Sequence, residues 1–449
     1  MSKFVESLRS VARKIFRAAL KAVDPYKAAH NSFTVKGTVL SLGGKGQKTL
    51  AYDLTLFKRI LVLGAGKASV PMAAACEEIL QKRISKGIIV TKYGHSGPLK
   101  YITTVEAGHP VPDKAGLHAA QDILTLLKGS QADDLVIFLT SGGCSALLPL
   151  PVPPITLSEK KKLTNLLLKS GATIHEINTV RKHISMTKGG KLAKLAYPST
   201  VINLILSDVV GDELDVIGSG PFIPDSSTFQ EAWEVLEKYN LKSRLPESII
   251  KHLQAGLKGK VQETPKPRQP YFRKVKNLII GSNLVALKAA EIKARDMGFE
   301  TLILSSQMQG EARELAKVYA AIAKEIVKSG HPFSPPVCLL AGGEPTVVVK
   351  GKGLGGRNTE LALALAIEIQ KLNGITFLSG GTDGTDGPTD AAGAIVSGST
   401  YRKALKKGLK PENYLAHNDS YSFFKETGGL LITGPTRTNV MDIHIMLIG

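Results

Sequence analysis

The chain is poor in cysteine, in aromatic residues and in long apolar runs, and each shortage excludes a class of protein. Three cysteines among 449 residues are too few and too scattered for a disulfide framework or a cysteine-based zinc site, and they fit a reducing compartment. No segment approaches the ~20 uninterrupted apolar residues of a membrane-spanning helix. Apolar residues make up 43% and charged residues 21%, which excludes wholesale disorder. At roughly 150 residues per domain, the length predicts two or three domains.

The charge balance is strongly basic, because Lys and Arg exceed Asp and Glu by 58 − 38 = 20. A nucleic-acid-binding protein is the first class to consider for such a chain. However, the chain has no basic run interleaved with aromatics and no finger, homeodomain or RNA-recognition motif, and its acidic residues concentrate in glycine-rich loops. The pattern therefore indicates a basic exterior that attracts anionic substrates. We expect neither a nucleic-acid nor a membrane partner. A non-catalytic basic binding protein stays an alternative that leaves the acidic loops unexplained.

Residues 1–23 carry six basic residues and one acidic residue, with apolar residues at spacings of three and four. This pattern predicts an amphipathic helix. A mitochondrial import segment is one interpretation, and the first helix of the fold is the other. The segment runs into Asp24-Pro25 with no cleavage zone, so we expect a helix of the fold and a cytoplasmic protein. The sequence leaves a homo-oligomer open.

One pattern repeats along the chain: a short apolar run ends in glycine or small polar residues, and a helical pattern follows. The runs are 60–63, 135–139, 201–206, 278–280, 338–340 and 375–378. They predict an α/β fold of two Rossmann-like domains with mostly parallel sheets, whose ligands bind beyond the carboxyl ends of the strands. The polar, proline-containing segment 256–270 predicts a connector. We therefore place the domains at 1–260 and 270–449.

The first glycine turn, Gly64-Ala-Gly66-Lys67-Ala-Ser69, follows an apolar run and precedes a helix. It is neither a Walker A loop nor a good dinucleotide fingerprint, since no acid follows at the ribose position. Backbone amides and one lysine suit an anionic group. A tight turn with a solvated Lys67 is the alternative.

Two further segments in this half of the chain carry groups that suit an anion. Ser141, Gly142 and Gly143 form a loop that can hold a carboxylate or phosphate, with simple packing as the alternative. Arg181 lies in a basic segment and is a candidate for contact with an anion.

A third segment of this half is acidic and follows the apolar run 201–206. Its Asp208 can hold Mg²⁺ or accept a hydroxyl proton, with helix capping as the alternative.

The C-terminal half holds three more unusual segments. Gly342-Gly343-Glu344 follows an apolar run, and Gly355-Gly-Arg357-Asn358 leads into a helical pattern, which is a geometry suited to phosphate. The segment 379–393 places aspartates among glycines, including Asp383 and Asp386, at a spacing that is not that of an EF-hand. A divalent ion or a polyhydroxy ligand would suit it.

Taken together, these motifs resemble those of the glycerate kinases that carry a MOFRL domain. The matching segments follow the family's order over nearly the whole chain: GAGKAS, AGHPVPD, LTSGGCSALL, NTVRKHIS, LSDVVGD, GGEPTV, GGRNTE, SGGTDGTDGPTDAAGA and TGPTRTNVMD. The resemblance implies two α/β domains with an active cleft between them and the phosphorylation of D-glycerate by ATP and Mg²⁺ to 2-phosphoglycerate. It also marks Lys67 and Arg357 as active-site residues. Some members are labelled hydroxypyruvate reductases, so an NAD(P)H-dependent reductase is the rival interpretation.

These arguments give a set of expected site residues. Lys67, Arg357 and Asp208 are expected to be catalytic, with Lys67 and Arg357 on the transferring phosphoryl group and the substrate carboxylate and Asp208 as proton acceptor. Asp383 and Asp386 are expected to hold the metal. The residues expected to bind substrate or nucleotide are Gly64, Gly66, Ser69, Ser141, Gly142, Gly143, Arg181, Gly342, Gly343, Glu344, Gly355, Asn358 and Asp386.

Overall fold

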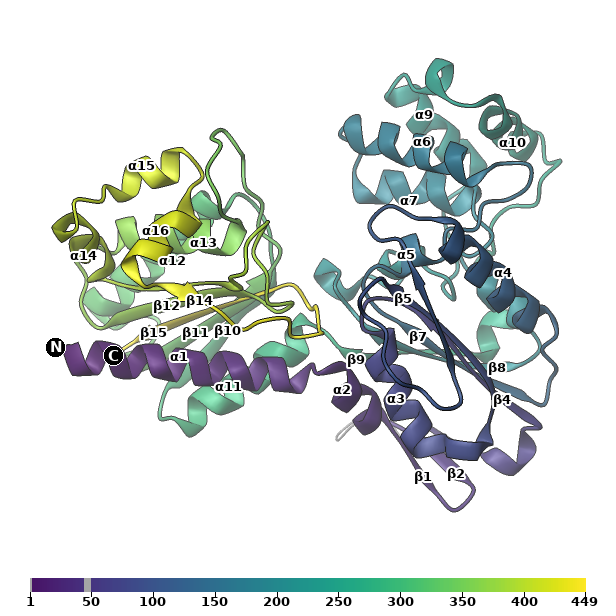
Figure 1. Cartoon of the computed structure of the whole chain (residues 1–449), viewed down its shortest axis with the longest axis horizontal. Coiled ribbons are helices and arrows are strands. Elements are labelled where there is room, and N and C mark those ends of the chain that lie inside the picture. Colours follow the sequence, from purple (N-terminus) through teal and green to yellow (C-terminus); the bar gives the residue numbers. More distant parts are fainter. Residues whose placement is uncertain (1, 44–49) are drawn as a thin grey trace. The chain divides into compact units, whose positions relative to one another are not determined.

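The computed structural model describes residues 2–43 and 50–449 and divides the chain into two compact units (Figure 1). The N-terminal unit comprises Pro25–Ser207 and Asp212–Ile280. The C-terminal unit comprises the residues up to Asp24, the short segment Asp208–Gly211 and Gly281–Gly449. The chain therefore passes between the units more than once.

The N-terminal unit is built on a six-stranded sheet in the order β6-β5-β4-β7-β8-β9. The pairs from β6 to β8 are all parallel, which confirms the predicted parallel sheet. The strands are almost continuously apolar because both faces are covered. The bounds are β4 Arg59–Ala65, β5 Ile84–Lys92, β6 Thr103–Ala107, β7 Asp134–Thr140, β8 Thr200–Leu206 and β9 Val275–Gly281.

Helices α3 (Ser69–Leu80), α4 (Lys114–Lys128) and α8 (Lys191–Ala196) contact this sheet. Four further helices, α6 (Leu157–Lys169), α7 (Ile174–His183), α9 (Phe229–Lys238) and α10 (Glu247–Leu257), pack around a separate apolar cluster at one end of the unit (Figure 1). Capping boxes begin α6, α7 and α9, so the first residues of these helices are well defined. The remaining elements are α2 (Pro25–Ser32), α5 (Cys144–Leu147) and a small antiparallel sheet of β1 (Phe33–Lys36), β2 (Val39–Leu42) and β3 (Leu50–Asp53).

The C-terminal unit has a second six-stranded sheet, in the order β10-β11-β15-β12-β13-β14. Here the structure differs from the prediction of a mostly parallel sheet, because only β10 and β11 pair in parallel and the other pairs are antiparallel. The last strand of the chain runs between β11 and β12 in the opposite direction, and β13 turns back alongside β12. The bounds are β10 Glu300–Met308, β11 Val337–Gly343, β12 Ile375–Gly381, β13 Gly393–Ser397, β14 Leu430–Leu431 and β15 Asp442–Ile448.

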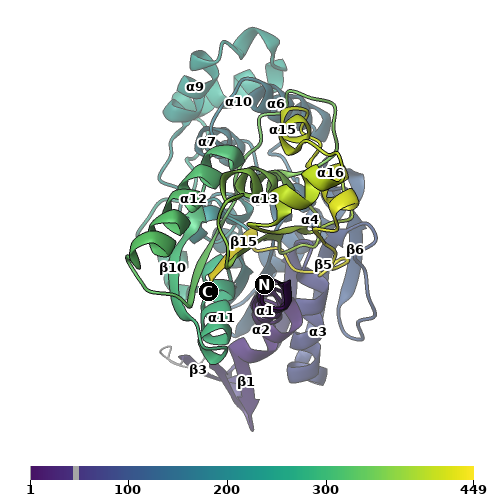
Figure 2. The same ribbon diagram turned by 90° about the vertical axis from the view of Figure 1, so that its left-hand side faces the viewer.

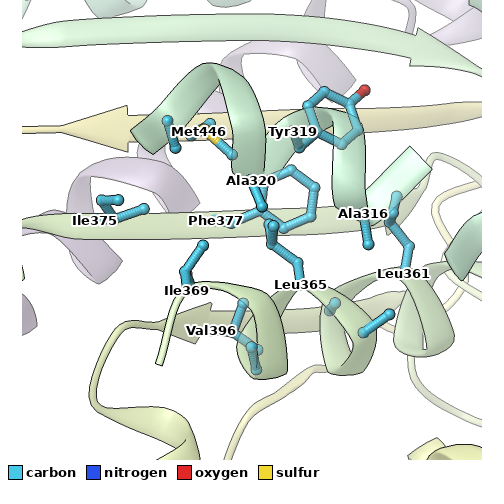
Figure 3. Packing of buried hydrophobic residues seen from close by; sticks show 14 of the residues in the cluster. Ala316, Tyr319, Ala320, Leu361, Leu365, Ile369, Ile375, Phe377, Val396 and Met446 are labelled. Atoms are coloured by element: carbon cyan, nitrogen blue, oxygen red, sulfur yellow. The ribbon is translucent and has the colours of Figure 1, made fainter. Parts of the chain in front are cut away.

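Helices cover both faces of the second sheet. Helices α1 (Ser2–Ala22) and α11 (Asn283–Asp296) lie on one face, and α12 (Ala312–Ser329) and α13 (Arg357–Glu368) lie on the other with α14 (Thr400–Lys406), α15 (Pro411–Ala416) and α16 (Ser420–Thr427) (Figures 1 and 2). In the core between sheet and helices, Tyr319 and Ala320 of α12 and Leu365 of α13 gather around Phe377 and Met446 (Figure 3). This packing holds the start of α13 at the edge where β11 and β12 end.

Helix α1 buries its apolar stripe, including Leu8, Ile15 and Phe16, as expected for a helix of the fold. It packs against α11, β12 and β15, and the Thr438 hydroxyl donates to the Val23 carbonyl at 2.7 Å. The helix therefore belongs to the C-terminal unit, whereas the sequence placed it in a domain 1–260. Amphipathic spacing predicts which face is buried but not which element covers it.

The polar segment 256–270 packs within the N-terminal unit. The Asp225 amide donates to the Pro265 carbonyl at 2.8 Å, and the Phe229 amide donates to Glu263 Oε1 at 2.8 Å. The chain then adds β9 to the first sheet before it enters the C-terminal unit at Gly281. The division therefore falls later than the predicted 260–270, because the apolar run 278–280 is a strand of the first sheet. None of the helices in the described ranges is both long and apolar enough to cross a bilayer.

Candidate functional site

The first glycine turn lies at the carboxyl end of β4, directly beside the loop that follows β7. The two loops are bonded together: the Lys67 amide donates to the Gly142 carbonyl at 2.9 Å, and the Ala68 amide donates to the Ser141 hydroxyl at 3.0 Å. Gly66 has a φ of +147°, and a Cβ there would lie 2.0 Å from Ser141 Oγ. Only glycine fits at this position. The structure thus brings Gly64, Gly66, Lys67, Ser69 and Ser141–Gly143 together, as the strand ends predict.

A histidine that the sequence analysis did not select completes this edge of the sheet. His109 follows β6, and a Cβ on Gly143 would lie 2.8 Å from its ring and 3.5 Å from the Lys67 side chain. Burial, together with the charges of Lys67, Lys92 and His95, lowers the pKa of His109 to about 4. The imidazole is therefore neutral at pH 7, and Lys67 is the cation at this point. The AGHPVPD motif was the available signal for His109.

Arg181 lies on α7, whose start is held by the capping box of Thr173 and Glu176. Its guanidinium donates to the Ser145 hydroxyl, at the far end of the second loop, and to Asn178 Oδ1 at 3.5 Å. Lys188 donates to the Ser145 carbonyl at 2.9 Å. Burial lowers the pKa of Arg181 to about 10. The structure therefore connects Arg181 to the loop of Ser141–Gly143.

In the C-terminal unit, Arg357 is the first residue of α13 and is held by two carboxylates. Its Nε and Nη2 donate to Asp442 Oδ2 and Oδ1 at 2.5 and 3.1 Å, and its Nη1 donates to Glu344 Oε1 at 2.7 Å. Asp442 begins β15 and lies opposite Gly343 of β11 and Gly381 of β12. Burial opposes the charge on the guanidinium, but Asp442 and Glu344 outweigh it and raise the pKa of Arg357. A cation at the positive end of a helix is unfavourable by itself, so these carboxylates stabilise it.

Asp386 is buried and caps the start of α13. Its carboxylate accepts the Asn358 amide at 2.9 Å, the Thr359 amide at 2.8 Å and the Thr359 hydroxyl at 2.7 Å. Asn358 is also buried and accepts the Ser379 hydroxyl at 2.6 Å. These contacts orient the helix that begins at Arg357. The side chains of Asp386 and Asn358 therefore already bind partners within the protein and have structural roles there.

The other predicted residues have less distinct surroundings. Asp383 is half-buried and accepts the Thr385 amide at 3.0 Å. Gly342 and Gly343 end β11, and Gly355 precedes the first turn of α13. Asp208 follows β8 and is grouped with the C-terminal unit. Within residues 2–43 and 50–449, no three His, Cys, Asp or Glu side chains form a group that could hold a metal ion.

Asp442 is the functional candidate that sequence reasoning missed most clearly in this unit. It is completely buried, and burial raises its pKa to about 6 despite the opposing effect of Arg357. The TGPTRTNVMD motif ends at this residue, but 85 residues separate it from Arg357 in the chain. Such a pairing depends on the placement of β15 between β11 and β12, which local sequence does not specify.

Two family models match the sequence of this chain. The model described as a domain of unknown function, DUF4147, matches residues 11–254, and the MOFRL family model matches residues 337–442. The protein is therefore of the class that joins these two α/β units. Within that class, the chain belongs to the family of MOFRL-domain glycerate kinases, as the following relatives establish.

The chain is 44% identical to the glycerate 2-kinase of Pyrococcus horikoshii, covering 98% of this chain and 97% of the relative. The crystal structure of a glycerate kinase from Thermotoga maritima superposes with a TM-score of 0.88 at 43% identity and covers 99% of this chain and 100% of that one. A protein of Agrobacterium vitis named putative hydroxypyruvate reductase is 41% identical and covers 99% of this chain and 95% of the relative. The rival name thus occurs within the same family.

Proposed function

We propose that the protein is an ATP-dependent kinase that phosphorylates D-glycerate at its 2-hydroxyl, giving 2-phosphoglycerate and ADP. The observation that carries the proposal is similarity over the full chain to a glycerate 2-kinase at 44% identity. The glycine loops that present Lys67 and Arg357 support it, since they offer cations and amides at strand ends. Phosphoryl transfer requires positioning and charge neutralisation more than covalent chemistry.

In this proposal, each unit supplies a cation. Lys67 and Arg357 bind the transferring phosphoryl group and the substrate carboxylate, and the backbone amides of Ser141–Gly143 and Gly342–Gly343 bind phosphate oxygens. The bond between the γ-phosphorus and the bridging oxygen of ATP breaks as the 2-oxygen of glycerate bonds to phosphorus. Asp208, which is half-buried, accepts the proton of that hydroxyl.

Among the residues that the structure describes, no three carboxylate, histidine or cysteine side chains gather into a group that could hold a metal ion. Of the two aspartates expected to hold the metal, Asp386 already accepts hydrogen bonds from the start of α13, which leaves Asp383. Magnesium commonly keeps several waters and binds substrate phosphates with only one or two carboxylates. We therefore propose that Mg²⁺ enters as Mg-ATP, as part of the substrate, and we assign no step to a protein-bound ion.

Release of ADP from Mg-ATP by the purified protein tests this function. We expect ADP to form only when D-glycerate is present. A parallel reaction contains hydroxypyruvate and NADPH and is followed by the loss of NADPH absorbance. If the folded protein releases no ADP but consumes NADPH, the proposed kinase activity is wrong and the reductase takes its place.

A further inference from the structure

Three basic side chains lie together in the N-terminal unit beside Ser145 of α5. They are Arg181 of α7, Lys160 of α6 and Lys188, which lies between α7 and α8, and both lysines are almost completely buried. Burial lowers the pKa of both Lys160 and Lys188 well below the usual value for lysine, and the neighbouring positive charges add to the effect. The partners that the structure records for them are neutral oxygens: Ser145 for Arg181 and Lys188, Asn178 for Arg181, and the Pro149 carbonyl for Lys160.

A neighbouring lysine shows how this unit pairs a buried positive charge with carboxylates when the charge has a structural role. Lys182, the next residue on α7, lies 3.3 Å from Asp215 and 3.4 Å from the buried Asp225. Buried charges are costly unless they are paired. Among the described residues, no carboxylate pairs with Arg181, Lys188 or Lys160, so an anion from outside the chain would stabilise the charged forms of this cluster.

Arg181 also has an unused donor. Its Nε is buried and has no partner among the described residues, while its Nη2 donates to Ser145. Nε and Nη2 form one edge of the planar guanidinium, and this edge matches the two oxygens of a carboxylate. Arginine stays protonated in proteins, so the cluster keeps at least one positive charge at all working pH values.

Ser145 and Arg181 are only partly buried, so one side of the cluster keeps some exposed surface. Ser145 is further fixed by Ser219, whose hydroxyl lies 3.1 Å from that of Ser145 and donates to Asn178 Oδ1 at 3.1 Å. Ser219 adopts a φ of +62°, which is rare for a residue with a side chain. The polar wall of the cluster is therefore held in place by three elements: α5, α7 and the turn at Ser219.

The position of the cluster relative to Lys67 suggests which part of the substrate it receives. Lys67 and His109 approach Gly143, and Arg181 and Lys188 approach Ser145, two residues further along the same loop. Two residues span at most about 7.2 Å between their Cα atoms. In a 2-hydroxy acid, the carboxylate is bonded to the carbon that carries the hydroxyl. A carboxylate at Ser145 would therefore keep that hydroxyl within a short distance of the part of the site that holds Lys67.

We propose that Arg181 and Lys188, together with the Ser145 hydroxyl, bind the carboxylate of the hydroxy-acid substrate, which leaves both Lys67 and Arg357 to the transferring phosphoryl group. This assignment rests on the proposed function, since it names the substrate subsite of the same reaction. It makes Arg181 a determinant of specificity for acids over neutral polyols.

The test measures the binding of D-glycerate, ATP and inorganic phosphate separately by titration calorimetry. Arg181→Met removes the guanidinium and keeps an unbranched side chain, Arg181→Lys keeps the charge without the fork, and Lys162→Met removes an exposed lysine of α6 as a matched control. Because charge-assisted hydrogen bonds are lost, we expect Arg181→Met to raise the Kd and the KM for D-glycerate roughly 10- to 100-fold. We expect the Kd for ATP to stay unchanged, Arg181→Lys to be intermediate, and Lys162→Met to match the wild type.

Other outcomes separate the subsite from the proposed function. An unchanged Kd for D-glycerate in folded Arg181→Met would overturn the carboxylate assignment and leave the kinase intact. Arg181-dependent binding of inorganic phosphate without binding of D-glycerate would also overturn it. Arg181-dependent binding of D-glycerate without ADP release would support the subsite and contradict the kinase. Should Arg181→Met fail to fold, Ser145→Ala tests the same site, with an expected rise in the KM for D-glycerate of several-fold.

Discussion

Replacement of Asp442 by Asn tests whether the buried carboxylate positions Arg357 for catalysis. The change keeps the size of the side chain and removes the charge that pairs with Arg357 Nε and Nη2. Removing one partner of a fully buried ion pair typically costs about 3–5 kcal/mol of stability. This range is an upper bound for Asp442→Asn. The Arg357 side chain is 33% exposed and keeps Glu344 at 2.7 Å. We therefore expect the free energy of unfolding to fall by about 1–3 kcal/mol.

The larger effect is expected on catalysis. A displacement of a catalytic group by about 1 Å can cost roughly 100-fold in rate, so we expect kcat to fall by about that factor while the KM for D-glycerate changes little. Glu344→Gln, which removes the more exposed partner of the same guanidinium, is the matched control with a smaller effect. Steady-state kinetics and thermal unfolding of both variants measure these quantities.

The pH dependence gives a second readout of the same prediction. Burial raises the pKa of Asp442 to about 6, so its carboxylate gains a proton, and loses its hold on Arg357, as the pH falls through that value. We expect the kcat of the wild type to decline below about pH 6 and the kcat of Asp442→Asn to lack this decline. A kcat within twofold of the wild type at pH 7, in folded Asp442→Asn, would refute the positioning role.

Three further predictions concern single residues. Lys67→Met should lower kcat at least roughly 100-fold. Its unfolding midpoint should stay unchanged, because the recorded hydrogen bonds of Lys67 involve its backbone, and the control Lys82→Met, at an exposed lysine, should match the wild type. Normal turnover by Lys67→Met would remove Lys67 from the site. Asp386→Ala should lower the free energy of unfolding by about 3 kcal/mol, because the buried amide donors at the start of α13 lose their acceptor. The control Asp390→Ala, at an exposed aspartate, should change the free energy of unfolding little. Burial lowers the pKa of His444 to about 3, so the folded protein loses stability as the pH falls below about 6.5, the pKa of histidine in the unfolded chain. Between pH 7 and 5, the free energy of unfolding of the wild type should therefore fall by about 2 kcal/mol more than that of His444→Asn. Equal losses in the two proteins would contradict this.

The glycine loops were predictable because each follows an apolar run, and strand ends of a parallel sheet meet at one edge. Lys67 and Ser141 therefore lie together as the sequence indicated, with β4 and β7 as neighbours. The second sheet could not be predicted in the same way. The apolar run of β15 shows a buried strand but not its direction, and its insertion between β11 and β12 makes most pairs antiparallel.

The partners of the predicted residues were harder to predict than the residues themselves. Arg357 was selected from its glycine loop, but Asp442 approaches it only through the order of strands. Asp386 was expected to bind a metal or nucleotide, and its place among aspartates and glycines gave no sign that it caps α13. A local pattern indicates the chemistry that a side chain can perform, whereas tertiary packing determines which groups use it.

The most direct test of the account is a reaction with Mg-ATP and D-glycerate in which enolase detects the product. Enolase accepts 2-phosphoglycerate directly, whereas 3-phosphoglycerate first requires a mutase. We predict an enolase signal without added mutase, equal in amount to the ADP released and absent in Lys67→Met. ADP release with an enolase signal only after mutase is added would place the phosphate on the 3-hydroxyl and contradict the proposed 2-kinase, and no ADP release from folded protein would contradict the kinase itself.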